Sequence, residues 1–286
     1  MSGWTTLVQA EELAAALEAP GLAVVDCRHS LADPAAGEAA WRDAHIPGAL
    51  HADMDRDLSA PPAPGSGAGR HPWPQAAALC RTLGAWGIAP RSQVVAYDAG
   101  DGAFAARLWF LLRALGHGRI AVLDGGWARW SALGLPCETK APLPPVPVEY
   151  PEAEFDQARL LGATRVQAHL RQGGLLLDAR AGERFRGETE PVDRMAGHIP
   201  GATSRPYAAN LSDGRFKPPA LLRDEFETLL AGRLADQAVA MCGSGVTACH
   251  HLLAMEHAGL KGGRLYTGSW SGWIDDPARP IATGAG

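Results

Sequence analysis

The sequence has few cysteines and no long apolar stretch. No window approaches about 18 uninterrupted apolar residues, and the start, Met1-Ser2-Gly3-Trp4-Thr5-Thr6, lacks a basic segment followed by an apolar one, so neither a membrane span nor export is indicated. The five cysteines show no CxxC or zinc-ligand spacing, which argues against a disulfide framework and a zinc site; they are Cys27, Cys80, Cys137, Cys242 and Cys249. These absences predict a cytoplasmic protein with reduced thiols.

The chain also lacks an excess of basic charge. Its 26 Lys and Arg against 31 Asp and Glu give a net charge of -5, which argues against a nucleic-acid partner. Ten histidines include the adjacent pair His250-His251, but neighbours on a helix point about 100° apart and do not readily share one ion. We therefore expect no metal there, and interpret both as surface or packing residues.

A length of 286 residues with 47% hydrophobic content predicts about two globular domains. Buried strand patterns alternate with helical patterns through the first half, as in a parallel sheet with helices on both faces. The predicted strands are 22–26, 93–97 and 120–123, and the predicted helical segments are 10–17, 75–86, 103–115 and 125–133.

The second half repeats the plan of the first. Three segments of the first half return in order, at 24–28 and 176–180, at 45–49 and 198–202, and at 123–127 and 266–270. Such a repeat predicts a tandem duplication of one α/β domain. We place the domains at 1–136 and 153–286, with a stiff, proline-rich linker at 137–152.

The segment Val239–Ala248 holds the strongest chemical signal. A short apolar run ends at Cys242, passes through a glycine-rich turn and continues as a helical pattern. Backbone N–H groups of such a turn, and the start of the following helix, stabilise an anion. We therefore expect a lowered pKa for the Cys242 thiol and a role as nucleophile.

The motif Cys242-Gly-Ser-Gly-Val-Thr247 resembles the active-site loop of the rhodanese superfamily, in the version typical of sulfurtransferases that use 3-mercaptopyruvate. His-Ile-Pro-Gly-Ala at 45–49 and 198–202 adds to the resemblance, which covers nearly the whole chain. It implies two tandem rhodanese-like domains, a persulfide on Cys242 and no cofactor. Backbone N–H groups of Gly243, Gly245, Val246 and Thr247 would form the cradle. Asp98 takes the place of the nucleophile in the first domain.

The donor is inferred from the residues that follow Cys242. The resemblance implies Arg and Lys there in thiosulfate-using members, whereas this chain has Gly243 and Ser244. A monoanionic 2-oxo acid such as 3-mercaptopyruvate fits a neutral loop if arginines elsewhere bind its carboxylate. The resemblance points to Arg184. The second family arginine is replaced by Val192, so Arg194 or Arg186 is the candidate substitute.

The resemblance also implies a group that delivers a proton to the departing enolate. Ser244 is the candidate next to the nucleophile, and Asp55 and His71 from the first half match its expected partners.

We consider three alternatives to a 3-mercaptopyruvate sulfurtransferase. A thiosulfate:cyanide sulfurtransferase is the main one, and a non-catalytic binding module is a lesser one. A phosphatase of the same fold would need an arginine six positions after the cysteine, where this chain has Ala248. The acceptor stays open among thioredoxin, cyanide and a small thiol.

Overall fold

The computed structural model describes residues 3–285, which form two compact units. The first unit comprises Met1–Ser59, Pro74–Asp156 and Asp213–Phe216, and the second comprises Ala60–Trp73, Gln157–Ser212 and Lys217–Gly286. Each unit therefore includes a segment from the other half of the sequence. No helix between residues 3 and 285 is long and apolar enough to cross a membrane.

The first unit is built on a five-stranded parallel sheet in the order β1-β5-β4-β2-β3. Its strands are β1 (Leu7–Val8), β2 (Leu22–Asp26), β3 (Leu50–His51), β4 (Gln93–Tyr97) and β5 (Ile120–Leu123). The central strand β4 is buried along its whole length, as expected for a strand covered on both faces.

The second unit repeats this topology as β6-β12-β11-β7-β8, again with every pair parallel. Its strands are β6 (Leu160–Leu161), β7 (Leu175–Asp178), β8 (Thr203–Ser204), β11 (Ala238–Met241) and β12 (Arg264–Tyr266). The short strands β9 (Leu211–Ser212) and β10 (Arg215–Phe216) form a separate pair. Identical strand order in both sheets confirms the predicted fold class of tandem α/β domains.

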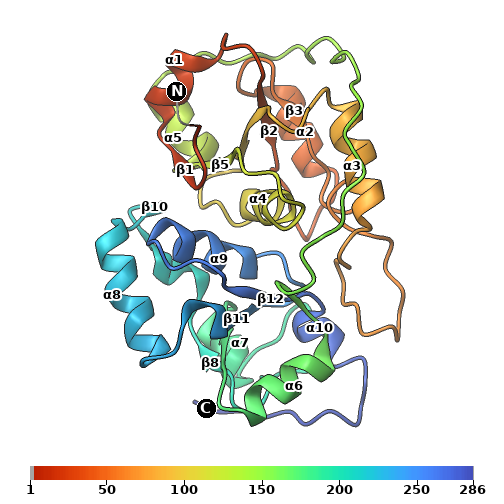
Figure 1. The fold of residues 1–286 in the computed structure, drawn as a ribbon, viewed down its shortest axis with the longest axis vertical. Helices are drawn as coiled ribbons and strands as arrows, with labels where there is room; N and C mark the ends of the chain where they lie inside the picture. Colours follow the sequence, from red (N-terminus) through yellow and green to blue (C-terminus); the bar gives the residue numbers. More distant parts are fainter. Residues whose placement is uncertain (1–2, 286) are drawn as a thin grey trace. The chain divides into compact units, whose positions relative to one another are not determined.

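Helices surround both sheets (Figure 1). In the first unit α4 packs against β4 and β5, and in the second α9 packs against β11 and β12. The helices of the first unit are α1 (Ala10–Ala16), α2 (Ala36–Asp43), α3 (Ala76–Ala85), α4 (Ala105–Ala114) and α5 (Gly126–Ala132). Those of the second are α6 (Ala163–Arg171), α7 (Gly182–Arg186), η1 (Tyr207–Asn210), α8 (Pro219–Leu230), η2 (Ala235–Gln237), α9 (Ala248–His257) and α10 (Ser269–Trp273).

A buried ion pair follows the equivalent strand in each copy. Asp178, the last residue of β7, pairs with Arg180 at 2.6 Å, and the Arg180 guanidinium lies 4.7 Å from the ring centre of Trp270. Asp26, the last residue of β2, pairs with Arg28 at 2.6 Å, and the Arg28 guanidinium lies 4.9 Å from the ring centre of Trp127. Each arginine is thereby held by charge and by an aromatic face.

The segment Ala60–Trp73, which the sequence places in the first half, packs within the second unit. The backbone N–H of Gly67 donates to Asp275 Oδ2 at 3.1 Å, and that of Arg70 donates to Ser271 Oγ at 3.0 Å. Gly69 has φ +81°, and a Cβ there would lie 2.5 Å from the Gly268 carbonyl oxygen. Only glycine permits this approach, so the apparently loose Pro/Gly/Ala-rich insert is closely docked.

His250 and His251 are both fully buried on α9, so they are packing residues rather than surface ones. The Asn210 side-chain amide donates to both Nδ1 atoms, at 3.0 and 2.9 Å, and His251 Nε2 donates to the Arg205 carbonyl at 2.7 Å. Both ring nitrogens of His251 are thus satisfied in the neutral form. Burial, together with nearby Arg205, lowers the pKa of His251 to about 3.

This pKa makes stability depend on pH. In the unfolded chain the pKa of His251 is near its ordinary value of 6.5, whereas in the folded chain the pKa is about 3. The contribution of neutral, buried His251 to the free energy of unfolding is therefore fully present above pH 6.5. It is lost as the pH falls from 6.5 towards 3, by up to about 1.4 kcal/mol per pH unit. We expect His251→Gln to flatten this part of the pH dependence of the free energy of unfolding, measured with urea. An unchanged slope would contradict the assignment.

Candidate functional site

The loop between β11 and α9 begins at Cys242, whose side chain is 2% exposed. Its backbone is fixed on both sides: the N–H of Cys242 donates to Ser269 Oγ at 3.1 Å, and its carbonyl accepts from the Trp270 N–H at 2.9 Å. Gly245 adopts φ +79°, a left-handed conformation that favours glycine. The loop is held in one shape by the start of α10.

Several backbone N–H groups of this loop have no acceptor among residues 3–285. They are those of Gly243, Ser244, Val246 and Thr247. Buried N–H groups without a partner are costly, and a set of them at a helix start is typical of an anion site. The loop can therefore receive negative charge on a group bound beside Cys242.

The first unit contains the same loop with an anion already in place. The Asp98 carboxylate accepts four backbone N–H groups, from Gly100 and Gly102 on Oδ1 and from Phe104 and Ala105 on Oδ2, at 2.9 to 3.1 Å. Burial and the charge of Asp101 raise the pKa of Asp98, whereas the N–H groups of the turn act to lower it. The turn itself therefore favours a negative charge at this point.

The backbone confirms that the two loops correspond. In the first unit the Trp127 N–H donates to the Asp98 carbonyl at 2.8 Å, and in the second the Trp270 N–H donates to the Cys242 carbonyl at 2.9 Å. Asp98 therefore lies at the position of Cys242 in the other copy.

Ser244 and His71 lie together in the second unit. Ser244 Oγ and His71 Nδ1 are 2.7 Å apart, and both side chains are buried. Although His71 is 173 residues earlier, the docked segment Ala60–Trp73 places it beside the loop. The pair can exchange a proton next to Cys242.

Two arginines lie beside Gly243. A Cβ on Gly243 would be 3.2 Å from Arg70 Nη2 and 3.8 Å from Arg184 Nη2. Asp193 bridges the two, pairing with Arg70 Nη1 and with Arg184 Nη2, the latter at 3.1 Å. Glu190 holds Arg184 from the other side through both carboxylate oxygens, at 2.6 and 3.1 Å. Positive charge thus reaches the loop from outside it.

The two carboxylates differ in their tendency to take a proton. Burial would raise the pKa of Glu190, but hydrogen bonds from Arg184 and from backbone N–H groups lower it overall. Burial raises the pKa of Asp193, and its ion pairs with Arg70 and Arg184 only partly offset that effect. Glu190 is therefore the firmer anchor of Arg184, and Asp193 the weaker partner of the pair.

A pocket of about 270 Å³ opens beside Arg70. Arg70, Asp193 and Ser271 line it, and the backbone N–H of Ser271 donates to the Gly243 carbonyl at 2.9 Å. A small organic anion fits this volume next to the loop.

Other predicted site residues have different surroundings. Arg186 is exposed and pairs with Glu188 through two hydrogen bonds, at 2.7 and 2.8 Å. Arg194 lines the pocket of about 270 Å³ with its guanidinium bound to the Ile274 carbonyl. Val192 also lines it. Asp55 belongs to the first unit, where its backbone N–H donates to Asp53 at 3.0 Å.

Sequence reasoning missed Arg70. The segment Arg70-His71-Pro72-Trp73-Pro74 drew attention only to His71, although Arg70 stands directly before it. Val192 stands where the family has its second arginine, and this could have prompted a search for a basic side chain in another part of the sequence. The docking of a distant segment could not be inferred from spacing.

Comparisons with known proteins agree with this geometry. The Rhodanese-like domain family matches residues 9–133 and 152–276. A Pseudomonas aeruginosa protein named probable 3-mercaptopyruvate sulfurtransferase is 52% identical over 281 residues, which cover 97% of this chain and 98% of that one. Thiosulfate sulfurtransferase of Bos taurus is 34% identical over 276 residues, which cover 93% and 89% of the two chains.

Among solved structures, the chain is similar to SseA from Escherichia coli, which is described as a 3-mercaptopyruvate sulfotransferase. The TM-score is 0.78 and the identity 29%, with 94% of this chain and 100% of that chain covered. Two matched domains and full-length relatives place the chain in the rhodanese family. Among residues 3–285, no group of three or more His, Cys, Asp or Glu side chains could hold a metal ion.

The four N–H bonds to Asp98 lead to a stability prediction. In Asp98→Asn the side-chain NH2 faces backbone N–H donors, so at least one buried donor loses its acceptor, at a cost of about 2 to 3 kcal/mol. Asp101→Asn is the matched control in the same loop, where Asp101 Oδ1 accepts the backbone N–H of Ala103. Urea unfolding should show a clearly larger loss for Asp98→Asn. Equal losses would refute the cradle interpretation.

Proposed function

We propose that the chain is a sulfurtransferase that moves a sulfane sulfur from 3-mercaptopyruvate to a thiol or cyanide acceptor through a persulfide on Cys242. The observation that supports it most is that two features occur together: loop N–H groups without an acceptor next to Cys242, and two arginines beside Gly243. The 52% identity to a relative named for this activity adds to it.

In the proposed first step the Cys242 thiolate attacks the sulfur of the donor. A new S–S bond forms, the C3–S bond of the donor breaks, and its electron pair becomes the enolate of pyruvate. The proton of the donor thiol is transferred to C3 of the enolate, which gives pyruvate and leaves the persulfide as an anion. The loop N–H groups stabilise the negative charge on the terminal sulfur of the persulfide. An acceptor nucleophile then takes this sulfur and restores the thiolate, as in other covalent mechanisms with two half-reactions.

The donor carboxylate is proposed to bind between Arg70 and Arg184. Arg184 Nη1 and Arg70 Nη2 donate no hydrogen bond to any residue in the range 3–285, and Arg70 Nε is buried without an acceptor. These N–H groups remain for the carboxylate, while Asp193 and Glu190 hold the guanidiniums in place. Arg70 would thus supply the second contact that Val192 cannot.

The Ser244–His71 pair is proposed to protonate the departing enolate carbon. Ser244 is two residues from the nucleophile, and its 2.7 Å contact with His71 connects it to an imidazole that can take up the proton of the donor thiol and return it through Ser244. Asp55 belongs to the first unit. Its part in this proton transfer stays a prediction from the resemblance.

Thiosulfate is the second candidate donor. Arg70 and Arg184 supply beside Gly243 the positive charge that the loop sequence itself lacks. The similarity to bovine thiosulfate sulfurtransferase points the same way. Asp193 and Glu190 nevertheless balance both arginines, which favours a donor with one negative charge over a dianion.

The proposed acceptor is a reduced thiol, with thioredoxin as a candidate and cyanide as its laboratory substitute. The free state of all five cysteines supports a reducing compartment, and we propose the cytoplasm.

The donor can be decided by comparing pyruvate release from 3-mercaptopyruvate with thiocyanate formation from thiosulfate and cyanide. We expect kcat/KM to be about a hundredfold higher for 3-mercaptopyruvate, or about 2.7 kcal/mol in transition-state binding. Cys242→Ser should abolish both activities. A preference for thiosulfate would reverse the donor assignment, and activity that survives Cys242→Ser would end the proposal.

The carboxylate clamp makes a separate prediction. Loss of one charge-assisted contact costs about 1.5 to 3 kcal/mol, so Arg70→Gln and Arg184→Gln should each lower kcat/KM for 3-mercaptopyruvate roughly 10- to 100-fold, mainly through KM. Arg186→Gln is the control, because Arg186 is exposed and paired with Glu188. Steady-state kinetics of the three variants tests it. An Arg70→Gln enzyme with unchanged kcat/KM for 3-mercaptopyruvate would exclude Arg70 from the carboxylate clamp.

A further inference from the structure

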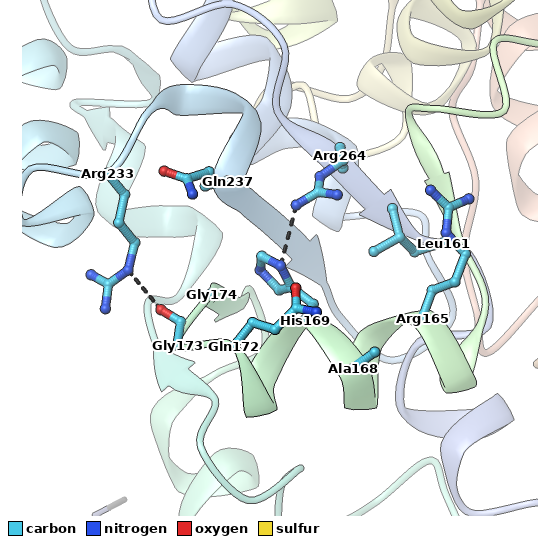
Figure 2. A pocket seen from close by; sticks show the side chains of 10 residues that line it. All are labelled: Leu161, Arg165, Ala168, His169, Gln172, Gly173, Gly174, Arg233, Gln237 and Arg264. Atoms are coloured by element: carbon cyan, nitrogen blue, oxygen red, sulfur yellow. Dashed lines mark hydrogen bonds between the residues drawn. The ribbon is translucent and has the colours of Figure 1, made fainter.

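A second pocket, of about 460 Å³, lies elsewhere in the second unit (Figure 2). Arg165 and His169 come from α6, Arg233 from the turn after α8, and Arg264 from β12. Leu161 and Ala168 add apolar lining. None of the residues that line it belongs to the loop at Cys242 or to the pocket beside it.

The three arginines of this pocket form no ion pair within the described chain. No carboxylate lines the pocket, although Asp236 lies close enough to affect the pKa of Arg264. Elsewhere in this acidic protein many arginines are paired, as Arg70 and Arg184 illustrate. Burial and the charge of Arg165 lower the pKa of Arg264, and Arg233 lines the opposite side of the same pocket (Figure 2). A bound anion would offset this repulsion between like charges.

The guanidiniums also retain many unused donors. Arg233 gives Nε and Nη1 to the carbonyls of Gly173 and Leu230, at 2.8 and 3.0 Å. Arg165 uses Nη1 alone. Arg264 gives only Nη2, and its Nε is buried with no acceptor. A buried N–H left without an acceptor is itself a sign that a ligand atom belongs there.

His169 adds a neutral group to this charged pocket. Its Nδ1 accepts from Arg264 Nη2 at 3.2 Å and its Nε2 donates to the Leu175 carbonyl at 3.1 Å, so both ring nitrogens are engaged in the neutral tautomer (Figure 2). Burial, followed by the charge of Arg264, lowers the pKa of His169. The positive charge of the pocket therefore comes from the arginines alone.

We propose that this pocket binds a small phosphomonoester through the arginines that line it, Arg165, Arg233 and Arg264. A phosphoryl dianion offers three oxygens to several guanidiniums, whereas one carboxylate offers two oxygens and a single charge. The volume of about 460 Å³ exceeds what one oxyanion fills and leaves room for an organic part against Leu161 and Ala168. The site is independent of the proposed sulfur transfer.

The experiment is a titration of the full-length protein with inorganic phosphate, ribose 5-phosphate and ribose, followed by NMR of 13C-labelled histidine rings. His169→Gln identifies the His169 resonance. We expect saturable shifts of this resonance with ribose 5-phosphate and with phosphate at millimolar concentrations or below, the ester binding more tightly, and none with ribose. Arg233→Gln and Arg264→Gln should each weaken binding at least tenfold.

Two controls test whether binding depends on this pocket rather than on the total positive charge of the protein or on the loop at Cys242. Arg171→Gln removes an exposed arginine from the same helix, α6, and should leave the affinity unchanged, as should Arg184→Gln. If Arg264→Gln does not fold, Arg165→Gln at an exposed position replaces it. An unmoved His169 resonance, or equal affinity in the arginine variants, would overturn the proposal. Phosphate binding without ester binding would overturn the assignment to an ester.

Discussion

The structure depends on one requirement: backbone N–H groups at the turn between the central strand and the following helix need a negative partner. The two copies meet it differently. In the first, the Asp98 carboxylate accepts four of these groups and closes the turn permanently. In the second, the same position is Cys242, and the N–H groups of Gly243, Ser244, Val246 and Thr247 have no acceptor in the described part of the chain. The duplication thus left one turn filled by its own side chain and the other open to a ligand.

A continuous row of ion pairs prepares the second turn for that ligand. It runs from Asp178 through Arg180, Glu190, Arg184 and Asp193 to Arg70. Long arginine side chains lose conformational freedom when they bind an anion, and here most of that freedom has been lost on folding. The ion pair of Asp178 and Arg180, which has a counterpart in the first copy, forms the buried end of this row.

Local signals predicted much of this arrangement. The strands predicted at 22–26, 93–97 and 120–123 are β2, β4 and β5 with the same bounds, and the repeated segments revealed the duplication. The short elements β1, α2 and β3 were missed, because a two-residue strand shows no period and α2 is an eight-residue helix with Gly37 in its first turn. Arg70 was missed for a different reason. Its place depends on backbone contact between Gly69 and Gly268, which lie far apart in the sequence.

The docking of Ala60–Trp73 on the second unit bears on why both copies persist in one polypeptide. A chain that began at the second repeat would keep Cys242 and Arg184 but would have neither Arg70 nor His71. In the proposed mechanism the first repeat, which has Asp98 at the position of Cys242, therefore contributes side chains to the site of the second. Separating the two repeats into different polypeptides would separate Arg70 and His71 from the loop at Cys242, which ties the two copies to a single chain.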